Sequence, residues 1–380
     1  MPEQDKYLLE SVLRACDVLQ AFRFEGEALR LRDIVSRTGI NKTTAFRLMR
    51  SLEKGNLIEV LPPGRYRSTI RPIRLRQLHL GYAAQGSDLI FSREITASIT
   101  RAADKEKVAL LSLSNEFSAR AALRNADKMI KARVDLAIEH QTFEEVAPLI
   151  SAKFREAKIP LIAIGFPHPG AVYYGANNYD AGLLAGRALG RWTKQRWEGV
   201  VDEVILLGRS MGGSVPQLRM QGMERGIHDI LGENASRFVH VSGDGHFDGA
   251  LRAIRRHLRF GNAEKTLVAA INDPSALGAL RAFEEAGRLN GCAVLGQGGS
   301  IDARAELRRP GTRLVGTVAY FPENYGPELM ALAAGMLGNK PTPNTVFIAH
   351  RLLTPANVNH YYPNDSAFST EDAVLLPFHG

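Results

Sequence analysis

The sequence predicts an α/β protein in two parts: a small basic N-terminal domain, then a larger domain of two lobes, each lobe a parallel sheet flanked by helices. Three observations support this fold class. The chain of 380 residues is too long for one hydrophobic core. The first 70 residues are mainly helical in pattern, whereas strand-like and helix-like segments alternate over the rest. Residues 1–75 hold fourteen Lys and Arg against nine Asp and Glu, so +5 of the net charge of +8 lies there.

The overall composition is that of an ordinary globular protein, with 45% hydrophobic and 23% charged residues. No run of eighteen apolar residues is present, and the N-terminal sequence MPEQDKYLLE has no apolar signal region. These features predict a cytoplasmic protein with no membrane partner. The two cysteines, Cys16 and Cys292, lie far apart and are expected to be reduced thiols rather than a disulfide.

Residues 39–57 predict a tight turn followed by an amphipathic helix. Asn41 is suited to cap the helix, and Gly55 is expected to end it in the left-handed conformation. Apolar residues at three- and four-residue steps give it one buried face: Ala45, Leu48, Met49 and Leu52. Hydroxyls and cations occupy the other face: Lys42, Thr43, Thr44, Arg47 and Arg50. A helix with this N-terminal end fits the major groove of DNA.

Two further helices and a hairpin are expected around this helix, at residues 7–22, 31–38, 57–61 and 66–70. Three helices and a hairpin make a winged helix-turn-helix. Arg65 and Arg67 then lie at the tip of the wing, where they can reach phosphates or the minor groove. The alternative is a three-helix domain used only for dimerisation or protein contact, but such a domain has no need for this set of cations.

Residues 6–69 contain three motifs: Val12-Leu13-Arg14, the segment GINKTTAFRLMRSLEKGNLIE and the wing GRYR. Together they resemble the N-terminal domain of the IclR family of bacterial transcription regulators. The resemblance implies that the partner is double-stranded operator DNA. A homodimer would read a pseudo-palindromic operator through two copies of the domain.

After Arg71-Pro72, strands and helices alternate in two series. Strands are expected at residues 75–82, 108–113, 134–139 and 160–165, then at 204–207, 238–241, 267–271 and 293–295. This alternation predicts parallel sheets covered on both faces, and the length predicts two lobes. Ligands of such sheets bind beyond the carboxyl ends of the strands. The residues there are polar and aromatic with few acids, which suits a neutral polyhydroxylated ligand.

Asn272-Asp273-Pro274 follows one of these strands. Asp273 is expected to cap the next helix, with Pro274 at the first helical position, because the missing N–H of proline costs nothing there. Asn272 would then face the ligand crevice.

Residues 75–363 contain the motifs YGANNYDAGLLAG, VSGDGHFDGA, AINDPSALGALRAFEEAG, GTVAYFPENYG and LLTPANVNHYYP. They resemble the type I periplasmic-binding-protein fold, which includes sugar-binding transport proteins and the effector domains of LacI-family repressors. The resemblance implies that Arg219 and Asn272 hold sugar hydroxyls and that Phe91 and Phe247 stack on the ring. With the residues expected at strand ends and crossovers, the candidate ligand set is Phe91, Phe166, Arg219, Asp244, Phe247, Asn272, Gln297 and Tyr320. The family usually carries an acid where this chain has Gln297, and an Asp-Arg pair where it has Gly165-Phe166.

The same resemblance implies three crossovers between the lobes, near residues 175–178, 320–322 and 345–350. The predicted domains are residues 1–70, residues 71–177 with 322–345, and residues 178–321 with 346–380. A hinge of this kind closes around its ligand. Closure would alter the spacing of two attached DNA-binding domains.

Catalytic and cofactor motifs are weak. The segment Gly208-Arg-Ser210-Met-Gly212 matches the nucleophile elbow of hydrolases. However, the helix is expected only at Leu218, and no suitable acid and histidine follow. The ten histidines show no metal-binding spacing, so neither a metal nor a cofactor is expected.

The sequence therefore predicts a cytoplasmic, homodimeric transcriptional regulator, a repressor rather than an enzyme. Its operator affinity would be controlled by a small-molecule effector, a sugar or polyol, bound between the two lobes. Two alternatives remain: a soluble solute-binding protein without a DNA role, and a hydrolase that uses Ser210.

Overall fold

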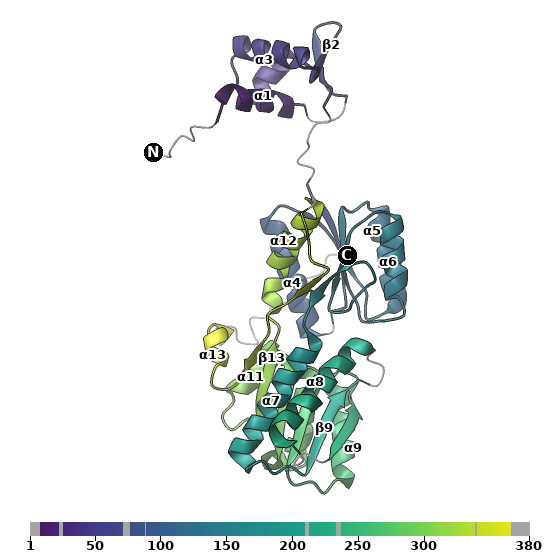
Figure 1. The fold of residues 1–380 in the computed structure, drawn as a ribbon, viewed down its shortest axis with the longest axis vertical. Coiled ribbons are helices and arrows are strands. Elements are labelled where there is room, and N and C mark those ends of the chain that lie inside the picture. The colour runs from purple at the N-terminus through teal and green to yellow at the C-terminus, as the bar shows by residue number, and fades with distance from the viewer. Residues whose placement is uncertain are drawn as a thin grey trace. The chain divides into compact units, whose positions relative to one another are not determined.

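The computed structural model describes residues 8–22, 26–70, 77–87, 89–209, 213–232, 237–338 and 340–365 (Figure 1). The chain divides into two compact units, Met1–Leu78 and His79–Gly380. Cys16 is exposed and Cys292 is buried, and neither forms a disulfide.

The first unit is a winged helix-turn-helix, as predicted. Its helices are α1 (Glu10–Gln20), α2 (Leu31–Thr38) and α3 (Lys42–Lys54), and its strands are β1 (Ala28–Arg30), β2 (Ile58–Leu61) and β3 (Arg65–Ser68). The strands form an antiparallel sheet in the order β1-β3-β2. Val18, Ile34 and Met49 meet in a core that joins the three helices to the sheet. Strand β1 was not predicted, because three residues are too few to show an alternating pattern.

The helix-turn-helix follows local signals, with one correction. Gly39 takes a positive φ of 71° and closes α2, and Asn41 Oδ1 accepts a hydrogen bond of 2.9 Å from the Thr44 N–H. The end of α3 differs from the expectation: Gly55 has φ −83°, and Asn56 takes the positive φ of 58°. The chain reverses one residue later than predicted, at a residue type that tolerates the left-handed region.

The second unit contains two six-stranded sheets. The first has the order β14-β8-β7-β6-β4-β5, with all pairs parallel. Its strands are β4 (His79–Ala84), β5 (Ala109–Ser114), β6 (Leu136–His140), β7 (Leu161–Ile164), β8 (Val172–Gly175) and β14 (Thr345–Phe347). Helices α4 (Ile90–Lys105) and α12 (Tyr325–Leu337) cover one face, and α5 (Ala119–Lys131) and α6 (Ala147–Glu156) cover the other (Figure 1). We call this the first lobe.

The second lobe has the strand order β10-β9-β11-β12-β13-β15. Its strands are β9 (Glu203–Gly208), β10 (Phe238–Ser242), β11 (Thr266–Ala270), β12 (Cys292–Gly298), β13 (Leu314–Ala319) and β15 (Arg351–Leu353). Its helices are α7 (Asn178–Trp197), α8 (Ser214–Leu231), α9 (Phe247–Phe260), α10 (Asp273–Glu285), α11 (Ile301–Arg308) and the short α13 (Val358–Tyr361). The predicted parallel sheet is confirmed, except that the edge strand β15 runs antiparallel to β13.

The chain passes between the lobes at three places, as expected. It leaves the first sheet after β8 and enters α7 of the second lobe, and it returns after β13 through the 3-10 turn Pro322–Asn324 into α12. It crosses again between β14 and β15.

Helices α7 and α8 pack backbone against backbone through glycines at four-residue spacing. A Cβ added at Gly186 would lie 2.0 Å from the Met223 carbonyl oxygen, and one added at Gly182 would lie 2.1 Å from the Arg219 carbonyl oxygen. Gly222 and Gly226 provide the same close approach from α8. This packing brings Arg219 on α8 beside Asn178 at the start of α7.

The start of α8 differs from the prediction. The helix begins at Ser214 rather than at Leu218, and Pro216 lies in its first turn, where its missing N–H would have had no helical acceptor. Ser210, the serine of the elbow-like motif, lies outside the described residues.

Candidate functional site

The exposed face of α3 carries the polar residues predicted for it. Lys42, Thr43, Arg47 and Arg50 are exposed, and Thr44, whose N–H donates to the Asn41 cap, is half-buried. The opposite face is fixed in the core by Ala45, Met49 and Leu52.

These cations differ in how firmly they are held. Arg50 pairs with Glu53 at 2.8 Å, and Arg67 in the wing pairs with Glu59 across the hairpin. Within the described residues, Lys42, Arg47 and Arg65 have no acidic partner, so their charges are available to a polyanion. Arg65 lies next to the turn, whereas Arg67 is two residues further along β3 and opposite Glu59.

Phe46 on α3 was missed by the sequence analysis. Its side chain is 47% exposed, beside Arg47, although it is large and apolar. The signal was present: Phe46 falls outside the three- and four-residue steps that define the buried face. An exposed ring at this position is suited to apolar contact with a thymine methyl group in the major groove.

The second unit encloses a cavity of about 350 Å³ between its two lobes. Seven of the eight predicted ligand residues line it: Phe91, Phe166, Arg219, Phe247, Asn272, Gln297 and Tyr320. Asp244 does not line it, and its carboxylate instead accepts a hydrogen bond from Ser242 Oγ at 3.0 Å. Asp244 takes a positive φ of 54° in the turn after β10, which points its side chain to its own turn.

Arg219 is held rigidly in the cavity wall. Its Nε and Nη2 donate to Asn178 Oδ1 at 3.0 and 2.6 Å, and its Nη1 donates to the Ile271 carbonyl at 2.8 Å. The guanidinium carbon lies 5.3 Å from the centre of the Tyr320 ring, a cation–π distance. Asn178 was expected only at a crossover, and the structure shows that it orients Arg219.

Asn272 lines the cavity as expected, but it rather than Asp273 caps α10. Asn272 is the N-cap of α10, since its Oδ1 accepts from the Ser275 N–H at 3.0 Å while its Nδ2 donates to the Gly245 carbonyl at 2.8 Å. Asp273 is buried inside the first turn and accepts from Thr317 Oγ1 at 2.6 Å and from the Ser300 N–H at 2.7 Å. A carboxylate that holds the loop after β12 cannot also cap α10, and the preceding asparagine does so.

Aromatic rings form much of the remaining wall. Phe91 meets Tyr320 and Tyr325 edge-to-face, with ring centres 6.1 Å apart in each pair. The Tyr320 hydroxyl donates to Gln297 Oε1, and Gln297 Nε2 is buried without a partner in the described part of the chain. His140 is buried, and burial lowers its pKa to about 4, so its imidazole is neutral. The described residues offer no hydrogen-bond partner to its Nδ1 either.

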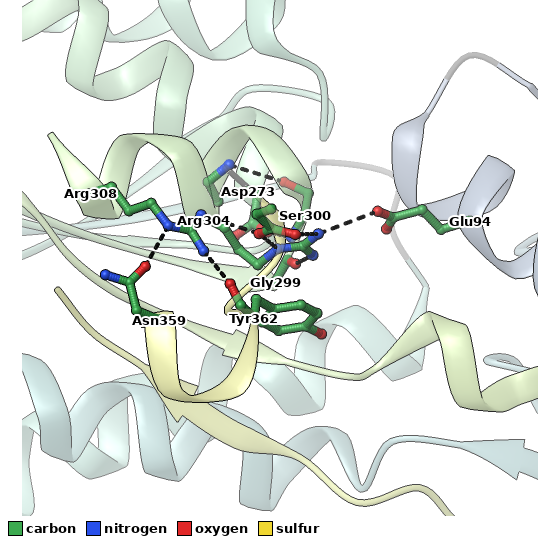
Figure 2. A network of polar contacts seen from close by, with 10 residues as sticks. Glu94, Asp273, Gly299, Ser300, Arg304, Arg308, Asn359 and Tyr362 are labelled. Carbon is green, nitrogen blue, oxygen red and sulfur yellow. Dashed lines mark hydrogen bonds and ion pairs between the residues drawn. The ribbon is translucent and has the colours of Figure 1, made fainter. Parts of the chain in front are cut away.

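Polar contacts between the lobes surround the cavity. Figure 2 shows Arg304 on α11 within a network that extends to Glu94 on α4 of the first lobe, 4.0 Å away. Burial raises the pKa of Glu94 to about 7. Elsewhere, Glu144 of the first lobe accepts from both the N–H and the hydroxyl of Ser214, at 3.1 and 3.2 Å, at the start of α8.

Among the described residues, no group of three or more His, Cys, Asp or Glu side chains is placed to hold a metal ion. None of the described helices has the length and apolarity that a membrane crossing requires.

The fold and the cavity define a two-lobed receptor of the periplasmic-binding-protein type, preceded in the same chain by a winged helix-turn-helix. The chain belongs to the family described as periplasmic binding protein domain, whose model matches residues 81–341. The IclR helix-turn-helix domain model matches residues 11–62. The first unit is therefore a helix-turn-helix domain of the IclR type. No curated protein sequence matches the chain significantly.

Solved structures similar to the second unit are solute-binding proteins. An ABC transporter solute binding protein from Bacillus halodurans C-125, with bound myo-inositol, has a TM-score of 0.68 at 18% identity, over 76% of this chain and 98% of its own. An ABC transporter periplasmic solute binding protein from Actinobacillus succinogenes 130z, with bound D-allose, has a TM-score of 0.67 at 17% identity, over 74% of this chain and 99% of its own. A protein from Mycobacterium smegmatis in complex with β-D-fucofuranose has a TM-score of 0.67 at 22% identity, over 76% and 95%. At these identities the likeness establishes the fold.

Proposed function

We propose that this chain is a transcriptional repressor that acts as a cytoplasmic homodimer. Its operator affinity is controlled by a sugar or polyol effector bound between the two lobes of the second unit. The observation that carries the proposal is that one chain combines an exposed basic recognition helix with an enclosed, aromatic and arginine-containing cavity.

The coupling between the sites is thermodynamic. An effector shifts operator binding only by its differential affinity for the open and closed lobes. Arg219 on α8 and Phe91 on α4 belong to different lobes, so a ligand that contacts both favours the closed arrangement. In a dimer, closure would change the spacing of the two recognition helices and hence the half-site spacing that they match.

The test is a DNA-binding titration with full-length protein and the DNA that flanks its own gene, with and without candidate sugars. Specific binding should weaken steeply with salt, and an effector should change the affinity at least several-fold. Arg219→Ala should abolish the effector response and leave affinity for DNA without effector unchanged. A protein that binds sugar but shows no specific DNA binding would instead support the second candidate, a solute-binding protein without a DNA role, which the similarity to transport proteins favours.

A further inference from the structure

The cavity contains hydrogen-bond acceptors that are already engaged by the protein. Asn178 Oδ1 accepts two N–H groups of Arg219, and Asn272 Oδ1 accepts the Ser275 N–H. Gln297 Oε1 accepts the Tyr320 hydroxyl. Both Asp273 oxygens accept from the protein as well, one from Thr317 and one from Ser300. Each of these oxygens thus already accepts at least one hydrogen bond from the protein.

Two side chains of the lining leave hydrogen-bond donors for a ligand. Gln297 Nε2 is buried and has no partner among the described residues. Arg219 has five N–H groups, of which three are used, so one remains on Nη1 and one on Nη2. Both are donors that a carboxylate can accept in the charge-assisted hydrogen bonds that arginine makes. Arg209, at the end of β9, also lines the cavity.

The acids of the lining do not neutralise Arg219. Within the described residues Arg219 contacts two neutral oxygens and an aromatic ring, and no carboxylate. Asp302 also lines the cavity, but it is exposed in the first turn of α11. A carboxylate only accepts hydrogen bonds and so suits unpaired donors, whereas a hydroxyl group in its place brings a proton that needs an acceptor of its own.

We infer that the effector is a sugar acid, a monosaccharide-sized ligand whose carboxylate is held by the free N–H groups of Arg219 and by Gln297 Nε2. The aromatic rings of Phe91, Phe247 and Tyr320 offer apolar contact to the rest of the ligand. This inference rests on the proposed function, because it identifies the ligand class of the same cavity.

Isothermal titration of full-length protein with matched pairs tests the inference: D-galacturonate against D-galactose, and D-glucuronate against D-glucose. We expect at least one acid to bind tenfold or more tightly than its neutral counterpart. The methyl ester of that acid keeps the shape without the charge, and it should lose at least tenfold in affinity. Binding of the neutral sugars as tightly as the acids, or of neither group, would overturn the assignment.

A substitution gives an independent test. Gln297→Glu replaces the unpartnered donor with a carboxylate of the same size, so it should weaken the acid at least tenfold and leave the neutral sugar within about threefold. Unchanged affinity for the acid in a folded Gln297→Glu protein would contradict the proposal. If the variant does not fold, the comparison of the acid with its methyl ester on the wild-type protein still tests whether the carboxylate is recognised. Operator binding by the ligand-free protein tests the proposed function separately: its loss alone would not affect the ligand class.

Discussion

Arg304 and Asp365 form a two-point ion pair that ties the C-terminal segment to α11: Nε lies 2.6 Å from Oδ2, and Nη2 lies 3.1 Å from Oδ1. The guanidinium carbon of Arg304 also lies 3.9 Å from the centre of the Tyr362 ring. Only 5% of Arg304 is exposed, so its charge depends on this partner rather than on water.

Asp365→Ala should therefore be strongly destabilising, by about 3 kcal/mol, because it leaves a buried guanidinium without its main carboxylate. Asp127→Ala is the matched control, since Asp127 pairs with Lys153 at 2.6 Å but is 59% exposed. Its loss should cost less than about 1 kcal/mol. Urea unfolding of the two variants measures the difference, and equal costs would show that burial of Arg304 does not matter.

Arg47→Ala should lower operator affinity at least tenfold, because Arg47 is exposed on α3 and has no acidic partner among the described residues. If it contacts a phosphate, the slope of log affinity against log salt should fall by about 0.9. Arg120→Ala removes one exposed charge from α5 in the second unit and serves as the control.

Glu53→Gln extends the DNA-binding test. Glu53 holds Arg50 at 2.8 Å, so removing its charge frees Arg50 and removes an acid from the recognition helix. Affinity for DNA should rise, as measured by fluorescence anisotropy at several salt concentrations. An unchanged affinity would place Arg50 outside the interface.

Gly186→Ala should destabilise the second lobe by more than about 2 kcal/mol, since the new methyl group would lie 2.0 Å from the Met223 carbonyl oxygen. The helices must separate, which displaces Arg219 and should also weaken effector binding. Gly335→Ala in α12 is the control: its new Cβ would lie 3.6 Å from Thr342 Cγ2. That variant should be neutral or more stable by up to about 1 kcal/mol. Thermal unfolding and ligand titration of both variants check these outcomes.

Stability should depend on pH through Glu139. Burial raises the pKa of this carboxyl to about 8, and Asn115 Nδ2 donates to its Oε1 at 2.7 Å. Because the pKa of Glu139 is raised in the folded state, the folded protein holds this proton more tightly than the unfolded chain does. The resulting contribution to the free energy of unfolding is present below about pH 4.5 and is lost progressively up to about pH 8. Glu139→Gln keeps the shape without the titration. The fall in melting temperature of the wild type between pH 5.5 and pH 8 should be smaller in this variant, and an identical fall would contradict the role of Glu139.

Local chemistry determined much of what the sequence analysis predicted. Asn41, Gly39 and the apolar steps of α3 act within a few residues of one another, so the recognition helix could be located from the sequence. The alternation of strands and helices similarly predicted two parallel sheets, and the motifs around Arg219 and Asn272 placed both residues at the cavity. Two predictions were wrong by one residue. The positive φ after α3 falls at Asn56 rather than Gly55, and the N-cap of α10 is Asn272 rather than Asp273.

The sequence by itself thus determined the order of the two units, the type of each and seven of the residues that line the cavity. Only the tertiary structure decided how those residues are used. Asn178 and Ile271 hold Arg219 although they lie 41 and 52 residues away from it in the chain. Thr317 on β13 and Ser300 after β12 donate hydrogen bonds to the Asp273 carboxylate. Hydrogen-bond partners over such separations depend on strand order and helix packing, which no local pattern encodes. Those partners also determine which N–H groups of Arg219 remain free for a ligand.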